Sequence, residues 1–71
     1  MITIEKLSKI EELLDERLEM ALDTDKRMGN EGDSFLPNNP DYLYYKGMIK
    51  TLDVLGYDYY REGYKHTVFV R

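Results

Sequence analysis

The chain has 71 residues, a formal net charge of −4 and no cysteine. This length predicts one small domain, and the lack of cysteine excludes disulfides and thiolate metal sites. Glu5, Lys6 and Lys9 interrupt the apolar residues near the N-terminus, so no signal peptide is expected. No window approaches the roughly 20 apolar residues of a membrane span. We therefore expect a soluble, cytoplasmic protein that does not contact a membrane.

The two halves of the chain differ in charge. Residues 1–35 carry ten carboxylates and five Lys or Arg, whereas residues 36–71 carry four carboxylates and five Lys or Arg. The acidic first half argues against phosphate binding there. The second half is mildly basic and rich in tyrosine, so any nucleic-acid surface is expected in it.

A first helix is predicted over residues 4–28. Thr3 is a suitable N-cap and Gly29 supplies the stop. A later start, with Ser8 and Glu11 as a capping box, would leave the preceding residues extended. The early start is preferred because the apolar residues already share one helical stripe. This stripe consists of Ile4, Leu7, Leu14, Leu18, Ala21 and Leu22.

The opposite face of this helix is acidic. Its carboxylates fall within an arc of about 100°. They are Glu5, Glu12, Asp15, Glu16, Glu19 and Asp23. Two interpretations stay open, a solvated face and a surface that docks a basic partner. Leu13 and Met20, seven residues apart, form a second apolar seam, which is either a dimer contact or the edge of a wide core face.

Residues 29–39 predict a loop, because they are rich in Gly, Asn, Asp, Ser and Pro. Phe35 and Leu36 interrupt that polarity and are expected to fix the loop to the core.

A second helix is predicted over residues 40–55. Asn39 is the expected N-cap, Pro40 fits the first helical position, and Gly56 is a natural C′ residue. Gly47 weakens the helix interior and is expected to permit a close approach by another element. The apolar stripe consists of Tyr45, Met48, Leu52 and Leu55.

The last third of the chain predicts an aromatic β-hairpin over residues 57–70. Glu62-Gly63 is the expected two-residue loop, which pairs Arg61 with Tyr64 and Tyr59 with His66; a longer loop would change this register. One face then holds Tyr57, Tyr59, Tyr64, His66, Val68 and Val70, and the other holds Asp58, Tyr60, Lys65, Thr67 and Phe69. An isolated hairpin is marginal in water, so it must pack on the helices, another chain or a ligand.

These elements predict an α+β fold of order α-α-β-β, with two amphipathic helices before a C-terminal antiparallel hairpin. The first helix contributes Leu7, Leu14, Leu18 and Ala21 to the core, and the second contributes Tyr45, Met48, Leu52 and Leu55. The hairpin contributes Val68 with either Tyr57 or Phe69. An exposed hairpin edge favours pairing with another chain, so a homodimer is expected.

No catalytic, metal or phosphate motif is present in the sequence. His66 is the only histidine and is expected to be structural or exposed. Asp23 and Asp25 begin a partial match to a calcium loop, but Met28 stands where the turn glycine is required and Ser34 where the bidentate Glu is required. We therefore expect no enzymatic activity, no metal and no cofactor.

Tyrosine is the one enriched side chain with functional promise. Exposed aromatics on a small β module stack nucleobases, while nearby Lys or Arg hold phosphates. The candidates for such a surface are Tyr59, Tyr60, Arg61, Tyr64, Lys65 and Arg71. The competing interpretation is that tyrosines build the core, as expected for Tyr45 and Tyr57.

Residues 44–48 (YYKGM), residues 52–57 (LDVLGY) and the ending HTVF at residues 66–69 resemble small uncharacterised proteins of phages and prophages of low-GC Gram-positive bacteria. The resemblance covers the C-terminal third to half of the chain and consists of packing and turn residues, so it implies no activity. It implies a context instead. Such proteins often bind a host or phage protein, some inhibit bacterial defence systems, and acidic ones can mimic DNA.

The leading hypothesis is a non-enzymatic protein-binding module, encoded by a phage or prophage, that modulates or inhibits a host protein through its acidic helix face. The alternative is a small nucleic-acid-binding regulator that uses the hairpin. A third hypothesis is a structural subunit of an oligomer.

Overall fold

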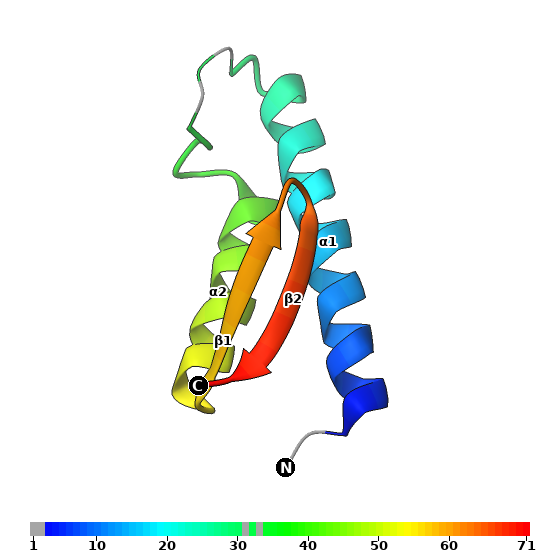
Figure 1. Cartoon of the computed structure of the whole chain (residues 1–71). Coiled ribbons are helices and arrows are strands. Elements are labelled where there is room, and N and C mark those ends of the chain that lie inside the picture. Colours follow the sequence, from blue (N-terminus) through cyan, green and yellow to red (C-terminus); the bar gives the residue numbers. More distant parts are fainter. Residues whose placement is uncertain (1–2, 31, 33) are drawn as a thin grey trace.

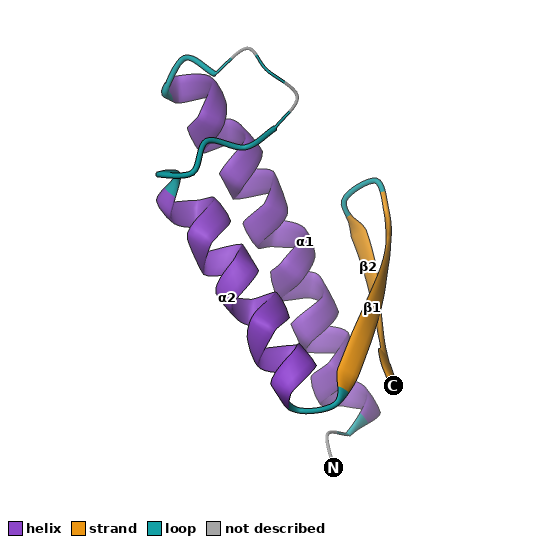
Figure 2. Cartoon of the chain, turned by 90° about the vertical axis from the view of Figure 1, so that its left-hand side faces the viewer, coloured by secondary structure: helices purple, strands orange, loops and turns teal. Residues whose placement is uncertain are grey.

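A computed structural model describes residues 3–30, 32 and 34–71. The elements are α1 (Ile4–Arg27), α2 (Pro40–Val54), β1 (Tyr57–Glu62) and β2 (Lys65–Val70). The two helices lie side by side in one layer, and the hairpin lies against one face of that layer (Figures 1 and 2). The predicted α+β fold of order α-α-β-β is therefore confirmed.

The start of α1 is fixed by its cap. The Thr3 side chain accepts a hydrogen bond of 3.2 Å from the Lys6 amide, so the early start is confirmed and the later start at Ser8 is wrong. The helix ends at Arg27, and Gly29 follows with a φ of 83°. This is the left-handed conformation that glycine adopts after a helix.

The start of α2 is fixed in the same way. Asn39 Oδ1 accepts hydrogen bonds from the amides of Asp41 at 3.0 Å and Tyr42 at 3.2 Å, which confirms it as the N-cap. The helix ends at Val54, and Gly56 has a φ of 87°. The start of α2 is the predicted one, and its end lies one residue before the predicted Leu55.

The hairpin register differs from the predicted one. The loop is Gly63-Tyr64 rather than Glu62-Gly63, so Tyr59 pairs with Val68 instead of His66. Gly63, with a φ of 63°, takes the first loop position, where a type II′ turn requires glycine. The shift spans two residues, and the side-chain period of a strand is also two, so the side chains that remain in the strands keep their predicted faces, whereas Tyr64 moves into the loop.

The hydrophobic core lies between the helix layer and the hairpin. Its buried members are Leu14, Leu18, Tyr45, Leu52, Tyr57 and Val68, and Ala21 is also buried. Leu7 and Met48 are only partly buried and pack at its edge. The hairpin contributes Tyr57 rather than Phe69, which is 45% exposed. Along the layer, β2 lies over α1 and β1 lies over α2.

Leu55 was expected in the core and is 59% exposed. The helix ends one residue earlier, and Leu55 forms its C-cap. Its side chain lines a groove between the helices to which no described hairpin residue contributes. The prediction failed because the apolar stripe was continued past the end of the helix.

The connection between the helices is anchored by Asp25. The Asp25 carboxylate accepts hydrogen bonds from Asn30 Nδ2 at 2.7 Å, Asn39 Nδ2 at 2.6 Å and the Leu36 amide at 3.3 Å. Burial opposes ionisation of this carboxyl, but the three donors outweigh it and lower the pKa of Asp25. The Phe35 ring stacks on Tyr42 with a centroid distance of 4.4 Å. The expected attachment of the loop to the core is confirmed.

Candidate functional site

A buried chain of hydrogen bonds joins α1, α2 and β2. Tyr45 Oη lies 2.7 Å from His66 Nε2, and His66 Nδ1 lies 2.7 Å from Asp15 Oδ1. The same carboxylate oxygen accepts the His66 backbone amide at 2.8 Å. Asp15, Tyr45 and His66 come from three different elements, so this network of hydrogen bonds forms only when α1, α2 and β2 are packed together.

The hydrogen-bond partners assign the protons in this chain. The Asp15 carboxylate only accepts, so His66 Nδ1 donates to it, and in the neutral imidazole Nε2 then accepts from the Tyr45 hydroxyl. Burial raises the pKa of Tyr45 to about 12, which keeps that hydroxyl a donor. The order of carboxylate, imidazole and hydroxyl is that of a nucleophilic triad. The His66 side chain is fully buried, so this network fixes the hairpin on the helices, and Tyr45 is its one member that lines an open cleft among the described residues.

The outer edge of β2 is occupied by two carboxylates of α1. In this register the amides of His66 and Val68 point away from β1. Asp15 Oδ1 accepts the first, and Glu11 Oε2 accepts the second at 2.7 Å. The exposed edge that favoured a homodimer is therefore closed along β2, because α1 supplies the acceptors that a neighbouring strand would supply.

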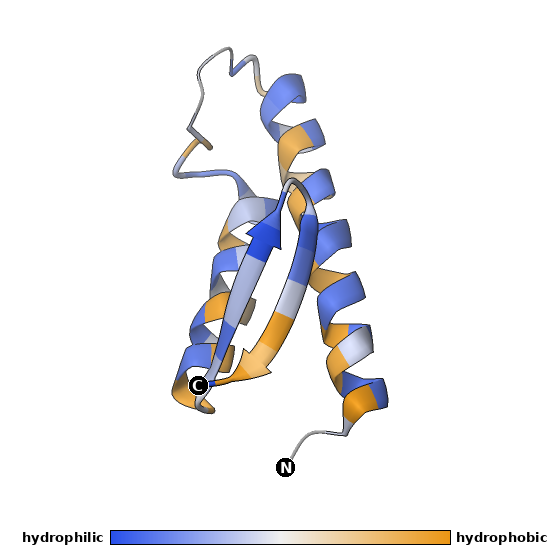
Figure 3. Ribbon diagram, in the orientation of Figure 1, coloured by the Kyte–Doolittle hydropathy of each residue, from blue (hydrophilic) through white to orange (hydrophobic). Residues whose placement is uncertain are grey.

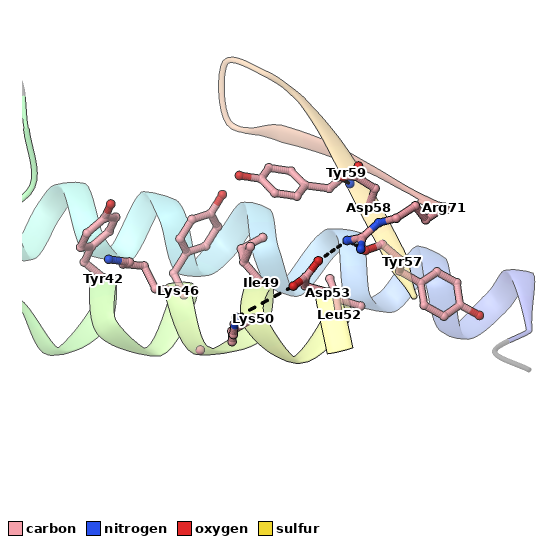
Figure 4. A pocket seen from close by; sticks show the side chains of 12 residues that line it. Tyr42, Lys46, Ile49, Lys50, Leu52, Asp53, Tyr57, Asp58, Tyr59 and Arg71 are labelled. Atoms are coloured by element: carbon pink, nitrogen blue, oxygen red, sulfur yellow. Dashed lines mark hydrogen bonds and ion pairs between the residues drawn. The ribbon is translucent and has the colours of Figure 1, made fainter. Parts of the chain in front are cut away.

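The edge of β1 borders an open cleft of about 640 Å³ between β1 and α2 (Figure 4). Its size is in the usual range of ligand sites. Ile49 and Leu52 of α2 form its apolar floor. Its aromatic walls are Tyr42, Tyr45, Tyr57 and Tyr59.

The rim of this cleft is positively charged. Lys46 Nζ lies 5.6 Å from the centre of the Tyr42 ring, and Lys50 Nζ lies 4.0 Å from Asp53 Oδ2. Arg71 forms an ion pair with Asp53, and the hydrogen bond in this pair lowers the pKa of Asp53 and raises that of Arg71. The lining thus carries Lys46, Lys50 and Arg71 against Asp53 and Asp58, on a chain whose net charge is −4.

The predicted acidic face is partly assembled on the outer side of α1, which Figure 3 colours as hydrophilic. Glu5, Glu12, Glu16 and Glu19 are exposed. Asp23 pairs with Arg27. Asp15 does not belong to this face, because it turns toward the hairpin and binds His66.

The residues proposed for nucleic-acid binding do not form one surface. Tyr60 and Lys65 lie on the outer face of the hairpin, where Tyr60 is 61% exposed. Tyr59 and Arg61 lie on the opposite face of β1, and Tyr59 packs against the core. Tyr64 is in the loop, and Arg71 is held by Asp53.

The contacts that Glu11 and Asp25 make in the folded chain were not predicted, although the sequence holds a signal for them. Together with apolar neighbours they follow a 4-3-4-3-4 spacing, which is the spacing of a buried helix stripe. The stripe is Leu7, Glu11, Leu14, Leu18, Ala21 and Asp25. A carboxylate inside such a stripe must find hydrogen-bond donors when the helix packs, and both do.

A comparison of the chain with protein-family models, curated proteins and solved structures finds no match. Within the described residues, neither helix has the length and apolar character needed to cross a bilayer. Among those residues, no group of three or more His, Cys, Asp or Glu side chains is arranged to hold a metal ion.

Proposed function

We propose that this chain is a non-enzymatic protein-binding module and that the cleft between α2 and β1 receives an extended segment of its partner. The observation that carries the proposal is the open tyrosine-walled cleft beside a strand edge. Tyrosine offers a large contact area and a polar tip, and it is enriched at protein interfaces.

The two edges of the hairpin differ in how they are closed, which supports this choice of site. The β2 edge is held by Glu11 and Asp15 from another element. Two contacts at the β1 edge come instead from side chains near it in sequence or at the surface. Asp58 accepts the Tyr59 amide at 2.8 Å in an exposed bond, and Arg71, 53% exposed, donates to the Tyr57 carbonyl at 3.2 Å. An incoming strand can replace such contacts with main-chain hydrogen bonds.

The lining defines the chemistry of the segment that fits. The apolar floor accepts an aliphatic or aromatic side chain. Lys46 and Lys50 at the rim favour a carboxylate beside it. The proposed ligand is therefore an extended peptide in which an apolar residue is flanked by Asp or Glu. The resemblance of the C-terminal part to phage and prophage proteins is the reason to seek that partner among bacterial host proteins.

Site-specific crosslinking tests the proposal. A photoreactive benzoylphenylalanine is placed at Lys46 in the cleft, at Glu19 on the acidic face and at Tyr60 on the outer hairpin face, and each protein is irradiated in a lysate of a low-GC Gram-positive bacterium. We expect one protein to be captured at position 46 and at neither of the other positions. Mass spectrometry identifies it.

Calorimetry with the captured protein then compares two exposed charge reversals. Lys46→Glu is expected to weaken binding about tenfold or more, because it opposes a carboxylate on the ligand. The control Glu19→Lys leaves binding unchanged. If Glu19→Lys weakened binding and Lys46→Glu did not, the binding surface would be the acidic face of α1. In the crosslinking experiment, capture of nucleic acid at position 60 would favour the nucleic-acid-binding regulator.

A further inference from the structure

A second pocket adjoins the cleft, where β1 and α2 meet the connection between the helices. It has a volume of about 360 Å³ and shares Tyr42, Tyr45 and Tyr59 with the cleft. Figure 4 shows the Tyr59 ring directed from β1 toward the end of the cleft at which Tyr42 lies. We call this hollow the Arg61 pocket. Its remaining lining residues are Leu18, Ser34, Phe35 and Arg61.

The polar side chains of the Arg61 pocket can all donate hydrogen bonds. They are the Arg61 guanidinium and the hydroxyls of Ser34, Tyr42, Tyr45 and Tyr59. No Asp or Glu among the described residues lines this pocket. A hollow that offers a cation and several hydroxyl groups without a carboxylate is complementary to an anion.

Arg61 differs from the other three arginines, because each of them is paired within the fold. The pairs are Arg17 with Asp41 and the Tyr44 ring, Arg27 with Asp23, and Arg71 with Asp53. Within the described part of the chain, the Arg61 side chain makes no ion pair, hydrogen bond or ring contact. Its guanidinium is therefore available to a ligand.

The strand register directs Arg61 toward the helices. Arg61 pairs with His66, and residues opposite each other in a hairpin share a face. Tyr57 and His66 on this face are buried. Burial raises the pKa of Tyr45 to about 12, and the positive charge of Arg61 opposes that rise. The guanidinium therefore acts on the tyrosine hydroxyls of the pocket.

The carboxylate nearest to this site is already satisfied. Arg61 also lines a smaller hollow of about 230 Å³, and Asp25 lines it too. The Asp25 carboxylate is buried and accepts hydrogen bonds from Asn30, Asn39 and the Leu36 amide. Asp25 thus serves the connection between the helices and leaves Arg61 unpaired.

We propose that the Arg61 pocket binds a carboxylate of the segment that the cleft receives. The source of the carboxylate rests on the proposed function, whereas the pocket itself does not. One guanidinium neutralises one negative charge and presents two parallel N–H groups, which matches a carboxylate better than a phosphate dianion. The stacked rings of Phe35 and Tyr42 and the Leu18 side chain supply apolar contact for the carbon atoms beside it.

Strand geometry sets the place of this carboxylate in the segment. Tyr57 and Leu52 line the cleft, and Arg61 follows Tyr57 by four residues on the same face of β1. A strand paired with β1 also advances about 13 Å over four residues. The apolar residue and the carboxylate are therefore about four residues apart. An Asp or Glu side chain can supply the carboxylate, and so can the C-terminus of a segment that runs parallel to β1.

Titration of the ¹⁵N-labelled protein with sodium benzoate tests the pocket without a partner, and benzamide is the uncharged probe of similar shape. We expect benzoate to shift the amide resonances of residues 34, 35 and 61 with a dissociation constant on the order of 10 mM, and benzamide to bind about tenfold more weakly. Arg61 is exposed and unpaired, so Arg61→Gln leaves the fold intact. It should weaken benzoate binding about tenfold.

The matched control is Lys65→Gln, which also removes one positive charge but on the outer face of the hairpin. It should bind benzoate like the wild type. Equal binding of benzoate and benzamide, or unchanged benzoate binding by Arg61→Gln, would overturn the proposal.

Two acetylated peptides distinguish the sources of the carboxylate. Leu-Thr-Val-Thr-Ala has a free C-terminus, and Leu-Thr-Val-Thr-Glu has an amidated one. We expect at least one of them to bind more tightly than benzoate and to lose about tenfold in affinity with Arg61→Gln, and the one that binds identifies the source. If benzoate binds at Arg61 and neither peptide does, the pocket stands but the extended segment of the proposed function does not.

Discussion

Single polar residues hold the elements of this small domain together. His66 uses both ring nitrogens and its amide, and each has a partner within 2.8 Å. No buried side-chain nitrogen or oxygen among the described residues lacks a hydrogen bond. Such a network specifies one packing of hairpin on helices, because any other packing leaves buried polar groups unpaired.

The Tyr45 hydroxyl is expected to contribute to stability mainly by satisfying His66 Nε2. Tyr45→Phe leaves that buried acceptor unpaired and should lower the free energy of unfolding by about 1–3 kcal/mol at pH 7, measured by urea denaturation. Tyr60→Phe, which removes an exposed hydroxyl, is the control and should change it by less than about 0.5 kcal/mol. Equal effects of the two variants would contradict the role of the network.

The pH dependence of stability in the wild type and in Tyr45→Phe tests the same hydroxyl in a second way. The pKa of Tyr45 is raised to about 12 in the folded state, against roughly 10 in the unfolded chain. The stabilisation of the folded state by protonated Tyr45 is therefore complete below pH 10. It declines between pH 10 and 12, by up to about 1.4 kcal/mol of unfolding free energy per pH unit, because the unfolded chain loses this proton first. The advantage of the wild type over Tyr45→Phe should shrink across this interval.

At the scale of elements, local signals predicted the helices and their caps, because Thr3, Asn39 and Gly56 act within one helical turn. The faces of the hairpin were also predictable from alternation. Its register was not, since the two possible loops share Gly63 and differ only in the position the glycine takes. The cleft, and the hydrogen bonds of Glu11 and Asp15 to β2, depend on the angle between the hairpin and the helices, which no local sequence pattern encodes.

Asn39 combines a local role with a tertiary one. Its Oδ1 caps α2, while its Nδ2 donates to the Ala21 carbonyl at 2.8 Å and to Asp25 at 2.6 Å. The residue is fully buried. An aspartate would keep the cap but would turn a carboxylate toward two acceptors.

We therefore expect Asn39→Asp to cost about 2–4 kcal/mol of unfolding free energy at pH 7, although Asn and Asp are equivalent at an ordinary N-cap. Thr3→Asp, at the exposed cap of α1, is the comparison and should be within about 0.5 kcal/mol of the wild type. Thermal and urea unfolding measure both. If Asn39→Asp left the unfolding free energy unchanged, the contacts from Asn39 to α1 would contribute little to stability.

The whole molecule is flat and rather elongated. Its Cα atoms extend 40 × 19 × 15 Å with a radius of gyration of 12.8 Å, where a compact domain of this length has about 11 Å. A layer of helices covered on one face only cannot enclose all its apolar residues. This shape explains why exposed apolar side chains gather on the uncovered face of the helices.

The hydrogen bonds that Glu11 and Asp15 of α1 accept from β2 join distant parts of the chain. They join Asp15 to His66 and Glu11 to Val68, across 51 and 57 residues of a 71-residue chain. Contacts between residues so far apart in sequence require closure of nearly the whole chain, which slows folding relative to a domain built from neighbouring contacts. The first helix, although synthesised first, reaches its final environment only when the last strand arrives.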